Sequence, residues 1–148
     1  MDSIRSKGWG IAAGIAVHLL FAVTVWALFW FLKGSRHGGM HGSLLMDACL
    51  ALMFCVPHSL LLHPVVRRRL TQVIPGAFYG LFFTAVTCVS LLVLFALWQT
   101  VGPVLWEAKG GFRVLVDAGF YLSWAALFYS LYLTGLGYQT GLTPWLAW

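Results

Sequence analysis

The chain has 148 residues, of which 61% are hydrophobic and only 9% are charged. Soluble domains are about 45–50% apolar and about 25% charged, so this composition excludes an ordinary soluble domain and indicates an integral membrane protein. The net charge of +5 comes from basic residues in the short segments between apolar runs, which is typical of topology signals and headgroup contacts. No nucleic-acid partner is expected.

Four apolar runs are each long enough to cross a bilayer, which takes about 20 residues of helix. In chain order they cover 8–32, 44–62, 76–98 and 112–136. The segments between them contain glycine, proline and charged residues, whose backbone groups cannot stay in lipid without partners. The sequence therefore predicts an all-α, polytopic membrane protein, in which about four transmembrane helices form a small bundle and a single domain over 1–148.

Basic residues flank the apolar runs on both sides of the membrane. One face carries Arg5, Lys7 and the triplet Arg67, Arg68 and Arg69, and the other carries Lys33, Arg36, Lys109 and Arg113. Because positive residues in short loops are retained on the cytoplasmic side, the excess of one charge predicts that both termini are cytoplasmic. We expect the first run to be a retained span, since it is longer than the about 7–15 residues of a signal-peptide core.

Two histidines lie inside the predicted spans, where ionisable side chains are costly and are functional candidates. His18 lies near the middle of the first run, and His58 follows Pro57 in the second. Two neutral imidazoles at matching depth can ligate the iron of a haem or the metal of another tetrapyrrole. The alternative is that each histidine hydrogen-bonds a neighbouring helix, and the sequence leaves both readings open.

Other polar residues of the spans are assigned structural roles. Asp47 lies three helical turns before His58, too far to contact it, and we expect its carboxylate to reach water or to favour the helix N-terminus. His63 is expected at headgroup depth with no further role. Arg113 and Asp117 are four residues apart, a spacing that predicts an interfacial ion pair that sets the depth of the helix, with a proton relay as the alternative.

The arginine triplet at 67–69 predicts contact with anionic lipid headgroups. The alternative is a cluster that binds the carboxylate or phosphate of a substrate. Glycine pairs with four-residue spacing predict close helix packing in membranes. These pairs are Gly10 with Gly14, Gly76 with Gly80, and Gly137 with Gly141.

No catalytic residue and no metal site are predicted. The sequence contains no phosphate-binding loop, no HExxH motif and no serine nucleophile elbow. The three cysteines lie inside apolar runs without the spacing of metal ligands.

The segment PHSLLLHPVVRRRLTQVIP is followed by a span that ends in LFALWQ and later by LYLTGLGYQ. This pattern, over 47–139, resembles the amino-terminal half of the NnrU and methanethiol S-methyltransferase-like membrane proteins. The matching positions are His58, Ser59, Arg67, Pro75, Gln99 and Gly135. Relatives in that group include membrane methyltransferases that use S-adenosylmethionine, more distantly the isoprenylcysteine carboxyl methyltransferases, and a haem-containing carotene isomerase.

In those methyltransferases the methyl-donor site, with its Arg-His-Pro motif, lies carboxy-terminal to the matched region. This sequence has no Arg-His-Pro, so the resemblance implies that the chain alone does not bind S-adenosylmethionine and is not an enzyme by itself. The leading hypothesis is a non-catalytic accessory subunit of a larger complex in a bacterial inner membrane, in contact with lipids and other transmembrane subunits. The alternatives are a haem- or pigment-binding redox or isomerase module that uses His58, and one half of a split methyltransferase.

Overall fold

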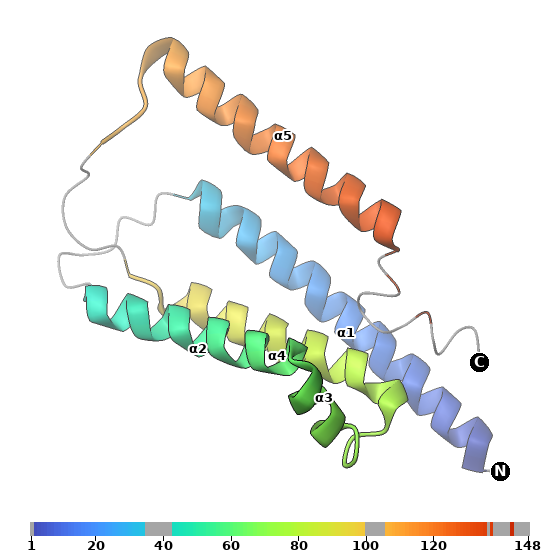
Figure 1. Cartoon of the computed structure of the whole chain (residues 1–148). Coiled ribbons are helices and arrows are strands. Elements are labelled where there is room, and N and C mark those ends of the chain that lie inside the picture. Colours follow the sequence, from blue (N-terminus) through green and yellow to red (C-terminus); the bar gives the residue numbers. More distant parts are fainter. Residues whose placement is uncertain (1, 35–42, 100–105, 136, 138–142, 144–148) are drawn as a thin grey trace. The chain divides into compact units, whose positions relative to one another are not determined.

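The computed structural model describes residues 2–34, 43–99, 106–135, 137 and 143, the side chains of 2–7 excepted. In these residues every regular element is a helix. The helices are α1 (Asp2–Lys33), α2 (Leu44–Leu62), α3 (Pro64–Leu70), α4 (Gly76–Leu97) and α5 (Gly110–Thr134) (Figure 1). All except α3 contain an apolar stretch long enough to cross a membrane, and in α1 this stretch is Gly8–Lys33. The predicted all-α polytopic membrane fold is confirmed.

The chain divides into two compact units. The first comprises 1–101 with 137–148 and contains α1 to α4, whereas the second comprises 102–136 and contains α5. The inference that all four spans form a single domain over 1–148 stays a prediction. Two predicted positions lie outside the described residues. They are Gly141, the second member of a predicted glycine pair, and Arg36, one of the predicted flanking basic residues.

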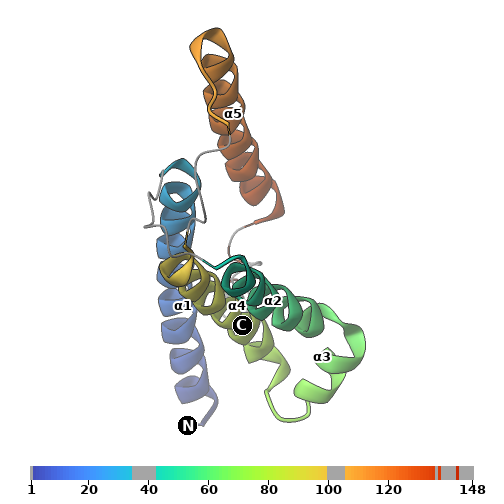
Figure 2. The ribbon, with the colours of Figure 1, turned by 90° about the vertical axis from the view of Figure 1, so that its left-hand side faces the viewer.

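In the first unit, α4 packs against both α1 and α2 and lies between them (Figure 2). Figure 1 shows that α1 and α4 run in one direction and α2 in the opposite one. The beginning of α1 and the short helix α3 therefore lie toward the same end of the unit, and the ends of α1 and α4 lie near the beginning of α2.

The apolar core of this unit lies where α1 and α4 end and α2 begins. Leu50 of α2 is buried there with Leu94 and Phe95 of α4. Phe31 of α1 stacks on Phe95, with ring centroids 4.7 Å apart and an interplanar angle of 29°, and meets Trp98 edge-on at 5.9 Å. Lipid tails are as apolar as these side chains, so close packing and dispersion, not escape from water, stabilise this contact.

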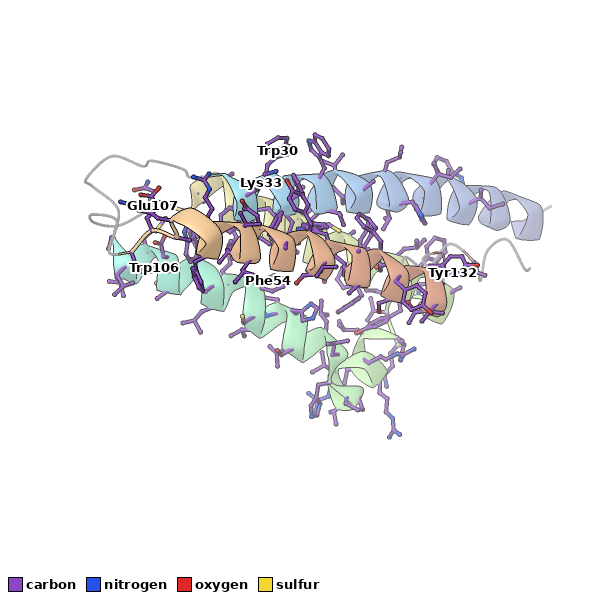
Figure 3. All side chains as sticks on the ribbon, turned by 90° about the horizontal axis from the view of Figure 1, so that it is seen from above. Trp30, Lys33, Phe54, Trp106, Glu107 and Tyr132 are labelled. Carbon is purple, nitrogen blue, oxygen red and sulfur yellow. The ribbon has the colours of Figure 1, made fainter. Side chains whose placement is uncertain are left out.

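Large apolar side chains also cover the outside of the first unit. Leu19 and Trp26 of α1 are 64% and 65% exposed, and Leu45 of α2 is 74% exposed. Figure 3 shows Trp30 on the outer side of α1. A water-soluble protein rarely exposes so continuous an apolar surface, and such faces are suited to contact with membrane lipid.

His63 forms the corner between α2 and α3. Its extended backbone ends α2, with its N–H donating to Leu60 O over 3.1 Å, and Pro64 begins α3 at a position that needs no backbone donor. The His63 Nδ1 atom accepts from the Val65 N–H over 3.4 Å and so caps α3. The expectation that His63 has no role beyond its depth is wrong, because its side chain satisfies a backbone donor at the beginning of α3.

In the second unit, α5 carries an aromatic row at four-residue spacing. The rings of Phe120 and Trp124 lie 6.2 Å apart, and those of Trp124 and Phe128 lie 5.9 Å apart. The predicted ion pair near its beginning is confirmed, since Arg113 Nε lies 3.9 Å from Asp117 Oδ2, with both side chains exposed. The helix ends at Gly135, whose φ of 75° favours glycine.

Candidate functional site

His58 is half-buried on α2 and faces α4. Phe54, one turn earlier on α2, stacks on the imidazole at a centroid distance of 5.3 Å, and Phe83 of α4 lies at the same distance. The Nδ1 atom lies 3.4 Å from Thr87 Oγ1. His58 is thus a polar link between α2 and α4, held between two aromatic rings.

The remaining ring nitrogen, Nε2, is the atom of His58 left for a metal. A bond at Nδ1 that fixes the tautomer is compatible with ligation through Nε2. His18 lies half-buried on α1. The described residues bring no three His, Cys, Asp or Glu side chains together around a metal. Haem ligation by His58 and His18 stays a prediction.

A second set of polar contacts lies between α1 and α4. Thr24 of α1 and Cys88 of α4 are 4% and 2% exposed, and their side chains hydrogen-bond. The Thr24 hydroxyl also donates to Leu20 O over 2.8 Å within its own helix. Sequence reasoning missed this pair because it examined ionisable groups, whereas hydroxyls and thiols fit inside a span at little cost.

Among the side chains that the structure describes, Asp47 is a buried acidic residue, at 6% exposure. Its Oδ1 accepts from the backbone N–H of Gln99 over 3.3 Å. Asp47 lies in the first turn of α2, where a negative charge favours the helix, but the expectation that it reaches water is wrong. Packing of α2 against α4 encloses the carboxylate and uses it to join the beginning of one helix to the end of the other.

The arginine triplet lies in α3, and all three arginine side chains are exposed. The basic segment that was predicted to follow a span forms a short helix. The guanidinium of Arg67 lies over the ring of Tyr79, 5.4 Å from its centroid. Contact of these arginines with lipid headgroups stays a prediction.

The four glycines expected to pack between helices differ in their surroundings. Gly10 and Gly14 are buried on α1, and Gly80 is half-buried on α4. Gly76 is exposed, and a Cβ added there would meet no atom within 4 Å. A packing role for these glycines stays a prediction.

The chain is similar to two bacterial methanethiol S-methyltransferases. It is 25% identical over 134 residues to that of Pseudomonas sp. (strain GM41(2012)), an alignment that covers 84% of this chain and 52% of the relative. It is 27% identical over 108 residues to that of Mycobacterium tuberculosis (strain ATCC 25618 / H37Rv), covering 72% of this chain and 44% of the relative. The chain thus spans about half the length of these curated relatives.

A shorter alignment relates the chain to nurim of Mus musculus, with 36% identity over 69 residues, 45% of this chain and 26% of nurim. No protein-family model and no solved structure matches the chain. The similarities confirm the resemblance to methanethiol S-methyltransferase-like membrane proteins. Its restriction to their amino-terminal half stays a prediction.

Proposed function

We propose that this chain is a non-catalytic accessory subunit that packs against other membrane-spanning chains of a larger complex. The observation that supports this most directly is the use of its polar side chains. His58 with Thr87 and Thr24 with Cys88 each join two helices of the same unit, and Asp47 joins α2 to Gln99, just beyond the end of α4. These groups therefore fix the relative register of α1, α2 and α4 and hold them together, which is the ordinary use of polar side chains in membrane helices.

The exposed faces of the helices supply the contact surface in this proposal. Large side chains project from α1, α2 and α5, among them Trp26, Leu45 and Leu122, with exposures of 65%, 74% and 69%. Lipids and the spans of partner subunits are the two occupants of such a surface. We place the complex in a bacterial inner membrane with both termini cytoplasmic, in line with the arginines of α3 lying toward the end of the unit where α1 begins.

The natural cysteines provide a direct test. Cys49 and Cys55 are exposed on α2, whereas Cys88 is buried between α1 and α4. Variants that retain one cysteine each would be labelled in native membranes with a lipid-soluble maleimide photo-crosslinker. We expect Cys49 or Cys55 to crosslink to a second membrane-spanning chain, with Cys88 as the matched unlabelled control. Crosslinks to lipid alone at both exposed positions, together with purification of a lone chain, would contradict the subunit role.

The similarity to methanethiol S-methyltransferases over about half their length favours a second candidate, one half of a split S-adenosylmethionine-dependent methyltransferase. In that case the crosslinked partner carries the methyl-donor site. Binding of radiolabelled S-adenosylmethionine by the assembly, but not by this chain alone, would support the split enzyme over a purely structural complex. Binding by this chain alone would contradict both candidates.

A further inference from the structure

We propose that Arg67 and Arg68, with Leu62, Pro64 and Thr71, form a binding site for one phosphate group, which we call the basic pocket. These five residues line a hollow of about 330 Å³ at the corner between α2 and α3. Arg69, the third arginine of the triplet, does not line it. Two of the three arginines therefore line the pocket, and Arg69, with the same side chain, provides a control.

The position of Arg67 follows from the way α2 ends. The last carbonyls of a helix have no partner within it, and the Val65 N–H, which would otherwise reach the Leu61 carbonyl, donates to His63 instead. The hydroxyl of Tyr79, a side chain only 6% exposed, donates to Leu61 O over 2.5 Å. Tyr79 therefore holds the end of α2 against the beginning of α4.

The Tyr79 ring in turn supports the Arg67 guanidinium. The guanidinium carbon lies 5.4 Å from the ring centroid, within the range of a cation–π interaction. An arginine so supported loses less conformational freedom when it binds a ligand than one extended into solvent. The Arg67 guanidinium is therefore already positioned in the pocket when no ligand is bound.

The charges of the pocket have no acidic partner among the described side chains. Among the described side chains, an ion pair joins Arg113 to Asp117 on α5, away from the pocket residues. Within the same part of the chain, neither Arg67 nor Arg68 pairs with a carboxylate. Two planar guanidinium groups offer parallel N–H donors, a pattern that matches phosphate oxygens. The Thr71 hydroxyl donates to Arg68 O over 3.0 Å, so the guanidinium groups are the donors toward a ligand.

Leu62 and Pro64 give the same hollow an apolar wall. A phosphate attached to a hydrocarbon tail, as in an anionic phospholipid, would place its ester oxygens on the arginines and its tail beside these residues. A free phosphate would use only the arginines. The inference deepens the proposed membrane role, on which it rests for the location of α3 at the membrane surface. Its test measures anion binding and leaves crosslinking at Cys49 and Cys55 as an independent result.

The test uses the full chain in two arms. In the first, native mass spectrometry counts the lipids retained from micelles that contain phosphatidylglycerol or phosphatidylcholine. In the second, inorganic phosphate is titrated onto the protein in phosphatidylcholine nanodiscs. We expect Arg67→Gln and Arg68→Gln each to lower the affinity for the phosphate group by at least about tenfold, because each change removes a charged hydrogen bond. Arg69→Gln is the matched control and should retain wild-type affinity.

Further variants separate positioning from charge. Arg67→Lys keeps the charge but loses the planar donor pair and should lower affinity by several-fold. Tyr79→Leu removes the ring under Arg67 and should lower affinity by several-fold, although both arginine charges remain. Retention of phosphatidylglycerol alone identifies a lipid headgroup as the ligand, and binding of inorganic phosphate identifies a soluble anion. Equal losses in all three arginine variants, or no retained anion in either arm, would overturn the site.

Discussion

The carboxylate of Asp47, in the first turn of α2, accepts a hydrogen bond from the backbone N–H of Gln99, just beyond the end of α4. This bond joins positions 52 residues apart in the sequence. It gives a buried carboxylate a hydrogen-bond donor, and it gives the Gln99 N–H, which lies outside α4, an acceptor.

Asp47→Asn should leave stability nearly unchanged, because an amide oxygen can accept the same bond. Asp47→Leu removes the acceptor, and we expect it to cost about 1 kcal/mol, typical of a single hydrogen bond. The local readout is hydrogen exchange in a peptide that covers the end of α4, which should become faster in Asp47→Leu only. Equal exchange in both variants and the wild type would show that the bond does not hold the end of α4.

The link between His58 and Thr87 predicts an energetic coupling between these residues. Thr87→Val removes the hydroxyl at nearly constant volume, and His58→Ala removes the imidazole. In a double-mutant cycle the two changes should be non-additive by about 0.6–1.7 kcal/mol, the range for polar links between membrane helices. Unfolding in mixed detergent measures each free energy, and Ser59→Ala, an exposed neighbour, should show no coupling to Thr87→Val. Additive effects of the first pair would contradict the link.

The stacked pair of Phe31 and Phe95 predicts that the core is most sensitive at its aromatic contact. Phe95 is 5% exposed, whereas Phe82 on the same helix is 37% exposed. Phe95→Ala should destabilise the protein by about 2–4 kcal/mol through lost packing, and Phe82→Ala by less than half as much. Thermal unfolding of the two variants in the same detergent makes the comparison. A Phe82→Ala variant as unstable as Phe95→Ala would place the core elsewhere on α4.

The buried glycines of α1 predict a steric limit. Gly10→Leu or Gly14→Leu should destabilise the protein by about 1–3 kcal/mol, because a large side chain must enter a buried surface. Gly8 on the same helix is the matched control, since a Cβ there would meet no atom within 4 Å. Gly8→Leu should keep or raise the melting temperature, as leucine favours helix more than glycine does. The packing role fails if all three variants melt alike.

The apolar runs sufficed to predict an all-α membrane fold, because a run of that length has few ways to satisfy its backbone in lipid other than by forming a helix. The contacts between helices were not predictable in the same way. Whether Asp47 meets Gln99, or His58 meets Thr87, depends on the register of α2 against α4, which packing over their whole length decides. The sequence pattern also did not reveal that a short helix, α3, begins at Pro64 directly after α2.

The hydrogen bond from Tyr79 to the end of α2 could have been predicted from the sequence. The last carbonyls of α2 need donors, and a tyrosine near the beginning of the next span is a natural source of one. Charge and spacing alone assign the arginine triplet to the membrane surface as a whole. The hollow that distinguishes Arg67 and Arg68 from Arg69 depends on the turn between α2 and α3, which residue spacing alone does not reveal.

The central proposal is that the polar groups inside the spans hold helices together, and the alternative is that His58 binds haem. An absorption spectrum of the protein, purified from native membranes in mild detergent with its bound components identified, tests it most directly. We expect no Soret band from this chain, and a His58→Ala variant that loses stability without any spectral change. A stoichiometric haem spectrum that disappears in His58→Ala would contradict the claim and make His58 the centre of a cofactor site.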